Sequence, residues 1–220
     1  MMNIFKRKST LPKIHWKDIT IARHKAILEV YKKYENDPED ALFAYDLATA
    51  VYGKEENWMD EMKVSEANEW VSTLAFVNEK PKPRTAKGEY ILNGHKYKVT
   101  MNMQNITTNQ FIDFQQMADQ SREHPAEFLS ILMVPKGHKY NDGYDISEVV
   151  NDIENYMSVE DCMGLSAFFF KLLQISIRRS IRSLRKLEHK ARKEGIMTEE
   201  QLQALQRISD LLEYANGLRQ

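Results

Sequence analysis

The sequence has a single cysteine, Cys162, so it cannot form a disulfide within the chain and contains no paired-cysteine metal or redox motif. Because Cys162 stands among apolar residues, we interpret it as a small core residue rather than a nucleophile. The sequence also has no apolar run of about 18 residues, as a membrane-spanning helix requires, and no signal-peptide apolar segment after the basic residues near Met1. These absences predict a soluble protein of a reducing compartment, the cytoplasm of the cell that makes it.

Sequence signatures of catalysis and of cofactor binding are also absent. There is no glycine-rich phosphate loop, no nucleophile-elbow motif, and no pair of histidines at the i, i+4 spacing of a helical metal site. The run from Asn141 to Asp145 is loosely like a calcium loop, but it lacks the ligand order and the terminal glutamate, and turn formation explains its residues better. We therefore expect a protein that is not an enzyme and that needs neither a cofactor nor a metal.

What the sequence does contain is ordinary for a globular protein: of 220 residues, 42% are hydrophobic and 29% are charged. That length allows one substantial core or two small ones. The formal net charge of -1 conceals an uneven distribution, because a basic stretch near the C-terminus is balanced by acidic residues elsewhere. Attraction of the whole protein to nucleic acid is therefore not expected, although a local basic patch remains an alternative.

The stretch from Ser158 to Glu194 organises the rest of the sequence. Ser158 is a suitable N-cap, and Glu160 and Asp161 follow in the first turn, where carboxylates suit the helix dipole. No proline occurs after Ser158, so the pattern predicts one unbroken helix about 55 Å long at roughly 1.5 Å per residue. Its first half, through about Ile175, has apolar residues on more than one face, which predicts burial nearly all round: Val159, Cys162, Met163, Leu165, Phe168, Phe169, Phe170, Leu172, Leu173 and Ile175.

From Ile177 onward the apolar residues narrow to a seam, and Gly195 is predicted to end the helix. Thr198, with Gln201 three residues later, has the pattern of a capping box at the start of a last helix. We expect the two helices to form an antiparallel hairpin along their seams, which are Ile177, Ile181, Leu184 and Leu187 in the first and Leu202, Leu205, Ile208, Leu212 and Ala215 in the second.

The clearest local signal is Asn93-Gly94, the residue pair that a two-residue type I′ turn prefers because both positions need a positive φ. The flanking residues predict a β-hairpin over about 89–100. Alone such a hairpin is only marginally stable, so it must lie against helices or pair with a strand of another chain. Elsewhere the sequence predicts short helices, with starts near Asp18 or Thr20, Pro38, Ser65, Thr107 or Thr108, Pro125 and Ile146, and packing anchors at Trp16, Trp58 and Trp70.

The predicted fold is mainly α, a helical bundle with one β-hairpin and a C-terminal antiparallel helical hairpin. We expect a flexible basic lead-in over 1–12 that includes Lys6, Arg7 and Lys8. A small helical subdomain over 13–79 follows, ending near Pro81 and Pro83. The hairpin and its helices occupy 80–157, and the long helix with the C-terminal hairpin occupies 158–220, as one compact unit with the segment before it.

The basic half of the long helix is the candidate interaction surface. Three roles are open for its cations: pairing with acids of the last helix, binding an acidic groove of a partner protein, or neutralising phosphates of a nucleic acid along 171–193. No aromatic residue is interleaved among the cations, which argues against stacking on single strands, so the sequence favours the first two roles. The candidate residues are Arg178, Arg179, Arg182, Arg185, Lys186, Lys190, Arg192 and Lys193.

Four segments resemble a known class of proteins. They are 89–97, 106–114, 140–145 and 166–170, and together with their surroundings, over roughly residues 10 to 190, they resemble small morphogenesis proteins of tailed bacteriophages, particularly those of gut Bacteroidales phages. The resemblance implies a non-enzymatic role in building a virion, and the arrangement is most similar to a tail assembly chaperone, a small helical protein that keeps the helices of the tape-measure protein soluble. The implied partners are tail or tape-measure proteins in the host cytoplasm.

Two alternatives to the chaperone role remain. The chain is longer than many such chaperones and is predicted to end in a charged hairpin. The first alternative is therefore a structural component of the virion, that is, a connector, tail or internal protein. Self-association is expected with this role. The second alternative is a nucleic-acid-binding protein that uses the basic residues of 171–193. No partner in a membrane is expected.

Overall fold

The chain is mainly helical in a computed structural model, which describes residues 11–37, 40–195, 198, 200, 201, 203, 207 and 208. The described residues fall into two compact units. The first comprises the residues up to Thr100 together with Thr107–Ser166, and the second comprises Met101–Ile106 with the residues from Ala167 on. The four segments predicted from the sequence, 1–12, 13–79, 80–157 and 158–220, are a different division, which remains a prediction.

The first unit begins with a helical bundle whose element bounds follow local capping chemistry. The Thr20 hydroxyl accepts from the backbone N–H of Arg23 at 3.4 Å, and the Asp40 carboxylate accepts from that of Leu42 at 2.8 Å. Gly53 ends the second helix in the left-handed region, with a φ of 60°. The elements are η1 (Trp16–Asp18), α1 (Ile21–Lys33), α2 (Ala41–Tyr52), α3 (Val64–Ser72) and η2 (Thr73–Asn78).

Two predicted helix starts in this bundle were wrong by one to three residues. The second helix was expected from Pro38 and begins at Ala41, because Asp40 supplies the cap. The third was expected to be capped by Ser65 and begins one residue earlier. It also tightens into a 3₁₀ helix at Thr73, whose hydroxyl donates to the backbone carbonyl of Trp70.

The three tryptophans pack the bundle, as the sequence indicated. The rings of Trp58 and Trp70 lie 5.2 Å apart at a steep angle, and Tyr52 lies 4.6 Å from Trp70. The indole N–H groups of two of them form hydrogen bonds within the bundle. Trp16 donates to the Glu79 carbonyl, and Trp58 donates to the Thr49 hydroxyl.

The predicted hairpin is confirmed, and it belongs to a sheet with one more strand. Strands β1 (Glu89–Leu92) and β2 (His95–Val99) meet through Asn93 and Gly94, whose φ angles are 49° and 79°. A third strand, β3 (Met133–Pro135), pairs antiparallel with β2. The hairpin therefore gains a strand of its own chain. The sequence missed β3 because two buried residues and a half-buried proline after a helical run carry no period-2 pattern.

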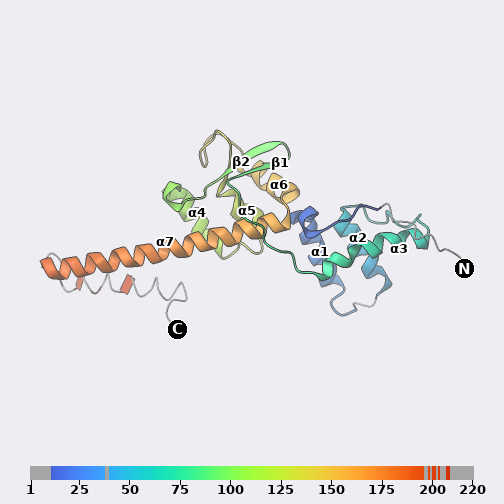
Figure 1. Cartoon of the computed structure of the whole chain (residues 1–220), viewed down its shortest axis with the longest axis horizontal. Helices are drawn as coiled ribbons and strands as arrows, with labels where there is room; N and C mark the ends of the chain where they lie inside the picture. The colour runs from blue at the N-terminus through green and yellow to red at the C-terminus, as the bar shows by residue number, and fades with distance from the viewer. Residues whose placement is uncertain are drawn as a thin grey trace, which may run out of the picture. The chain divides into compact units, whose positions relative to one another are not determined.

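Helices α4 (Thr108–Ala118), α5 (Pro125–Ser130) and α6 (Ile146–Tyr156) complete the first unit. Helix α5 packs against α6, and the hairpin lies beside α6 (Figure 1). The core between these elements includes fully buried side chains from the three helices, from β3 and from residues next to them: Phe114, Phe128, Leu129, Leu132, Met133, Ile153 and Met157. The predicted starts at Thr108 and Ile146 are confirmed.

Helix α7 (Val159–Glu194) is the unbroken 36-residue helix that the sequence predicted. Its first turn is fixed within the first unit by two backbone contacts. Residues 19–21 form a short antiparallel bridge with 157–159. The backbone N–H of Arg84 donates to the Glu160 carbonyl at 3.0 Å, and Gly164 lies against the Arg84 backbone.

The prediction that the first half of α7 is buried nearly all round was wrong. Val159, Cys162, Leu165 and Phe169 form one buried face. Three residues expected inside are more than one-third exposed, namely Met163, Phe170 and Ile175. The buried Cys162 is a free thiol, and burial raises its pKa to about 11, which fits a core residue.

At the end of α7, Gly195 has a φ of 63° and the expected capping box follows it. The backbone N–H of Thr198 donates to the Gln201 side chain at 3.0 Å, and the Gln201 N–H donates to the Thr198 hydroxyl at 3.3 Å. Most of the predicted second seam lies outside the described residues, and so do residues 1–10 of the lead-in predicted over 1–12. The antiparallel hairpin therefore stays a prediction.

Replacing Gly164 with alanine is expected to destabilise the protein, against ordinary helix propensity. Replacing glycine with alanine at an exposed helical position usually stabilises the folded protein by about 1 kcal/mol. At this position, however, the added Cβ would lie 1.7 Å from the Arg84 carbonyl oxygen. Overpacking against backbone typically costs about 1–3 kcal/mol. The measurement is the free energy of unfolding by urea. Lys171→Ala, on an exposed part of the same helix, is the control, and a Gly164→Ala protein as stable as this control would contradict the close approach.

Candidate functional site

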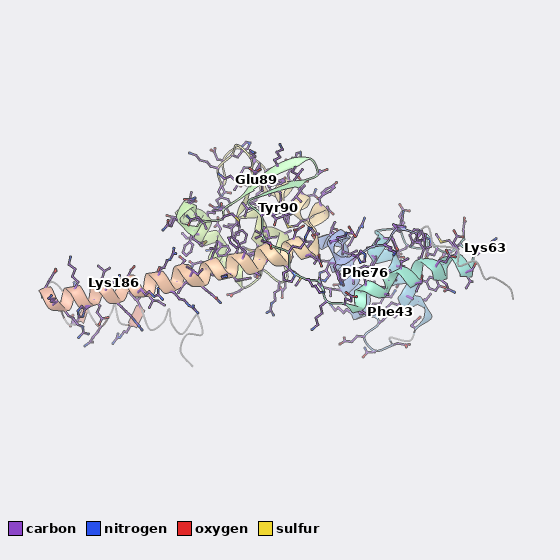
Figure 2. The ribbon with its side chains drawn as sticks, in the orientation of Figure 1. Phe43, Lys63, Phe76, Glu89, Tyr90 and Lys186 are labelled. Atoms are coloured by element: carbon purple, nitrogen blue, oxygen red, sulfur yellow. The ribbon has the colours of Figure 1, made fainter. Side chains whose placement is uncertain are left out.

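All eight candidate cations lie on the C-terminal half of α7, and all are exposed. Figure 2 shows long side chains standing out from this part of the helix, with Lys186 labelled among them. The two acids of the same stretch, Glu188 and Glu194, form ion pairs within the helix. Glu188 lies 3.1 Å from the Arg192 guanidinium, and Glu194 lies 3.9 Å from the Lys190 ammonium. Such exposed i, i+4 pairs contribute only about 0.3–0.5 kcal/mol each.

Four of the remaining six cations form a stripe along one face of α7. Arg178, Arg182 and Lys186 are four residues apart, and Lys193 follows at a distance of seven residues, so all four side chains share a face. We call these four residues the basic stripe. None of them forms an ion pair with any residue of the part of the chain that the structure describes. Arg179 borders the stripe.

Beside the basic stripe lies an open groove of about 900 Å³ within the second unit. One wall is the short 3₁₀ helix η3 (Met103–Asn105), which Asn102 caps by accepting from the Gln104 N–H. Its lining combines short serine side chains with larger apolar side chains. We call it the serine groove, and its lining on α7 is Leu172, Ile175, Ser176, Arg179, Ser180, Ser183, Leu184 and Leu187.

The serine groove changes the interpretation of the predicted seam. Ile181, a member of the seam, is 4% exposed, and Ala191 is 7% exposed, so this face of α7 is covered. Leu187 was placed in the same seam but is 57% exposed and lines the groove instead. The sequence signal that was missed is the recurrence of serine at Ser176, Ser180 and Ser183, which marks a further face of the helix.

A polar cluster around Asp152 explains the hairpin turn. The Asp152 carboxylate, buried at 3% exposure, accepts from the Tyr97 hydroxyl at 2.6 Å and from the Asn93 amide at 3.2 Å, and it lies 2.7 Å from Nδ1 of His95. Both carboxylate oxygens are therefore bound. The cluster ties the turn at Asn93 and Gly94 to α6, and we interpret it as structural. Sequence reasoning did not find it, because Asp152 is more than 50 residues from the other three members along the chain.

The electrostatics of this cluster favour the ionised carboxylate. Burial raises the pKa of Asp152, but the hydrogen bonds from Tyr97, His95 and Asn93 outweigh burial, and the pKa lies below its ordinary value. Burial and the neighbouring Asp152 charge raise the pKa of Tyr97, which stays a neutral hydrogen-bond donor.

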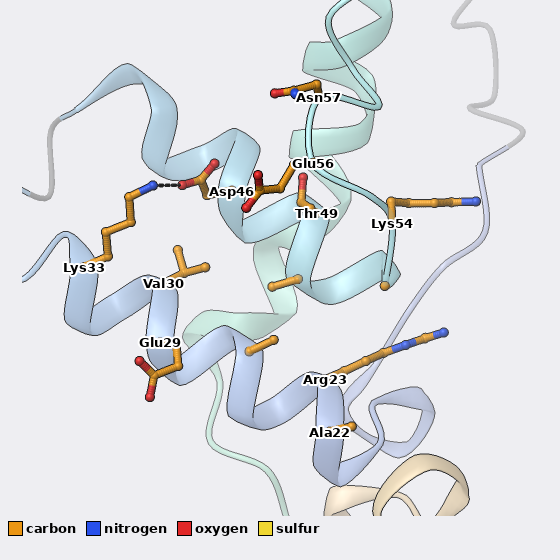
Figure 3. A pocket seen from close by; sticks show the side chains of 13 residues that line it. Ala22, Arg23, Glu29, Val30, Lys33, Asp46, Thr49, Lys54, Glu56 and Asn57 are labelled. Atoms are coloured by element: carbon orange, nitrogen blue, oxygen red, sulfur yellow. Dashed lines mark hydrogen bonds and ion pairs between the residues drawn. The ribbon is translucent and has the colours of Figure 1, made fainter.

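A second groove, of about 890 Å³, lies between α1 and α2 (Figure 3). Its walls include small side chains, among them Ala22, Ala26 and Ala50. The ammonium of Lys33 lies 2.7 Å from the Asp46 carboxylate, and the Tyr34 hydroxyl donates to the same carboxylate oxygen at 2.8 Å. That acid is therefore already paired with side chains of α1 and its C-cap.

The basic end of this groove also has a structural role. In Figure 3 the side chains of Arg23 and Lys54 extend in the same direction near the end of α2. Arg23 Nε lies 3.0 Å from where a Cβ at Gly53 would stand, so its guanidinium covers the C-terminal end of α2. A cation there interacts favourably with the partial negative charge of the helix end.

Two further observations concern the described residues only. They contain no group of three or more His, Cys, Asp and Glu side chains arranged to hold a metal ion. They also contain no helix with both the length and the apolar character to cross a membrane. In comparisons with known proteins, no family model, no curated protein and no solved structure matches the chain.

Protonation of Asp152 is expected to weaken the fold at low pH. Because its pKa in the folded protein is lower than the unfolded value of about 3.9, its contribution is complete above that pH and is lost as the pH falls through the lower folded value. Asp152→Asn removes this dependence, and it also brings amide donors against donors, at a cost of about 1–3 kcal/mol at neutral pH. Urea unfolding between pH 2 and 7 measures both effects.

Asp142→Asn is the matched control for this experiment. Asp142 is exposed, and its side chain forms no hydrogen bond with any of the described residues. It should keep the acid-induced loss of stability. An Asp152→Asn protein that follows the wild-type pH curve would show that the Asp152 carboxylate does not have a lowered pKa.

Proposed function

We propose that this chain is a non-enzymatic virion-morphogenesis protein of a tailed bacteriophage, that it acts through protein–protein contacts, and that its role is that of a tail assembly chaperone. The observation that supports a binding role is the C-terminal half of α7. There a groove partly lined by apolar side chains lies beside cations that have no acidic partner among the described residues. A chaperone for amphipathic helices needs a surface that combines these two chemistries.

The exposed apolar residues of the second unit support the same role. Leu187 is 57% exposed, and Phe170 and Ile175 are each more than one-third exposed. Single exposed apolar residues are common, but exposed apolar residues that line a groove, as Leu187 and Ile175 do, are typical of a binding site. The phage context comes from the sequence resemblance over residues 10–190, which names tail and tape-measure proteins as partners in the host cytoplasm.

A structural virion component is the second candidate, and the sheet favours it. Strand β1 pairs with β2 on one side only, so its other edge has no strand partner among the described residues. Ile91, on the outer face of β1, is 67% exposed. Open sheet edges of this kind support pairing between copies of one chain.

The two candidates differ in where the protein is found. The chaperone role predicts co-purification with the tape-measure or tail protein from infected cells and absence from purified particles by quantitative mass spectrometry. Leu187→Asp should abolish that co-purification, because it places a charge in the apolar lining of the groove, whereas Ile91→Asp should leave it intact. Stoichiometric copies in mature virions, together with assembly lost in Ile91→Asp but not in Leu187→Asp, would instead identify a virion component.

A further inference from the structure

We propose that the basic stripe and the serine groove bind one partner together: an amphipathic helix with leucine-like residues on one face and acidic residues along the flank of that face. The biological role of this partner rests on the proposed function, whereas its chemistry is inferred from the two surfaces alone. The two surfaces adjoin on α7, since Arg179 borders the stripe and also lines the groove.

The groove sets the shape and the apolar face of the partner. Small serine side chains at Ser176, Ser180 and Ser183 recur every three or four residues, the spacing that brings side chains onto one helix face. Short side chains allow a second helix to approach closely, and the side chains of Leu172 and Leu187 line the same groove. Apolar residues of the partner therefore replace water against these leucines.

The stripe sets the charge of the partner. Its members Arg178, Arg182 and Lys186 repeat at about 6 Å along the helix axis, at roughly 1.5 Å per residue. Acidic residues at the positions that flank the leucine face of an adjacent helix would meet these cations as interhelical pairs, as charged residues at e and g do in two-helix coiled coils.

A nucleic acid is the less favoured partner. Phosphates would be neutralised by the stripe, but they would make no use of the apolar lining at Leu172, Ile175 and Leu187. A protein interface needs both an apolar centre and a polar rim, and the groove with its adjacent stripe supplies the two. The apolar component therefore decides between the two classes of partner.

Three synthetic 28-residue peptides test the proposal on the full-length protein by fluorescence anisotropy. The first has leucine at positions a and d of each heptad and glutamate at e and g. The second has lysine in place of the glutamates, and the third keeps the glutamates but has glutamine in place of the leucines. We expect the acidic leucine peptide to bind at least tenfold more tightly than either of the others, because only it matches both surfaces.

Substitutions in the protein assign the binding to this face. A variant with Arg178→Gln, Arg182→Gln, Lys186→Gln and Lys193→Gln should bind the acidic leucine peptide about tenfold more weakly, the loss expected from several exposed pairs. A control with the same charge change, Lys17→Gln, Lys32→Gln, Lys80→Gln and Lys139→Gln, alters exposed lysines outside the second unit and should bind as the wild type does. Circular dichroism confirms that both variants keep their helix content.

Exchanging the charges provides the sharper test. With Arg178→Glu, Arg182→Glu and Lys186→Glu, preference should move to the lysine peptide, and a merely structural effect of the substitutions would not produce that reversal. Tighter binding of a 24-base-pair DNA duplex than of the acidic leucine peptide, with a loss in the stripe variant, would overturn the proposal in favour of nucleic acid. Equal binding of all three peptides, no binding, or unchanged binding by the stripe variant would also overturn it.

The outcome is separable from that of the proposed function. Binding of the acidic leucine peptide without co-purification of any tail protein would leave the interaction surface standing and remove the phage role. Co-purification of a tape-measure protein that survives the stripe substitutions would have the opposite meaning.

Discussion

The first unit depends on the contact between the backbone of Arg84 and the first two turns of α7. Gly164 lets the Arg84 carbonyl approach closer than any side chain would allow, and the Arg84 N–H donates to the Glu160 carbonyl. The Arg84 guanidinium lies 3.4 Å from the Asp161 carboxylate, and the bridge between Thr20 and Ser158 holds the same turn from another direction. Segments that are distant in sequence thus meet at the start of one helix, and the strand β1 follows a few residues after this contact.

Because its start is anchored in this way, the two ends of α7 have different roles. The buried face from Val159 to Phe169 packs the start of the helix. Farther along, the exposed faces are not needed to complete the core, and they carry cations and a groove instead. A helix can hold these functions together because its faces are independent: residues three or four apart share a face, while adjacent residues do not. The covered face at Ile181 and Ala191, the basic stripe and the serine groove therefore coexist on the same few turns.

Features with a local physical cause could be predicted from the sequence. The type I′ turn at Asn93 and Gly94, the caps at Thr20 and Ser158, and the capping box at Thr198 each involve residues a few positions apart. Features that arise from packing between distant segments could not be predicted. The exposed side of α7 at Phe170 depends on what lies around the helix, and the Asp152 cluster joins a turn to α6 across more than 50 residues. The cations of the candidate site were identified by composition alone, whereas the groove beside them depends on where η3 packs.

Amide hydrogen exchange of the full-length protein, with and without the acidic leucine peptide, tests most directly whether the second half of α7 is a binding surface. Amides of 162–169 should exchange slowly in both conditions, because they belong to the anchored part of the helix. Amides of 172–193 and of 102–105 should become more slowly exchanging when the peptide is added. Protection that appears instead in α1, α2 or the sheet, or no change anywhere at saturating peptide, would contradict the account.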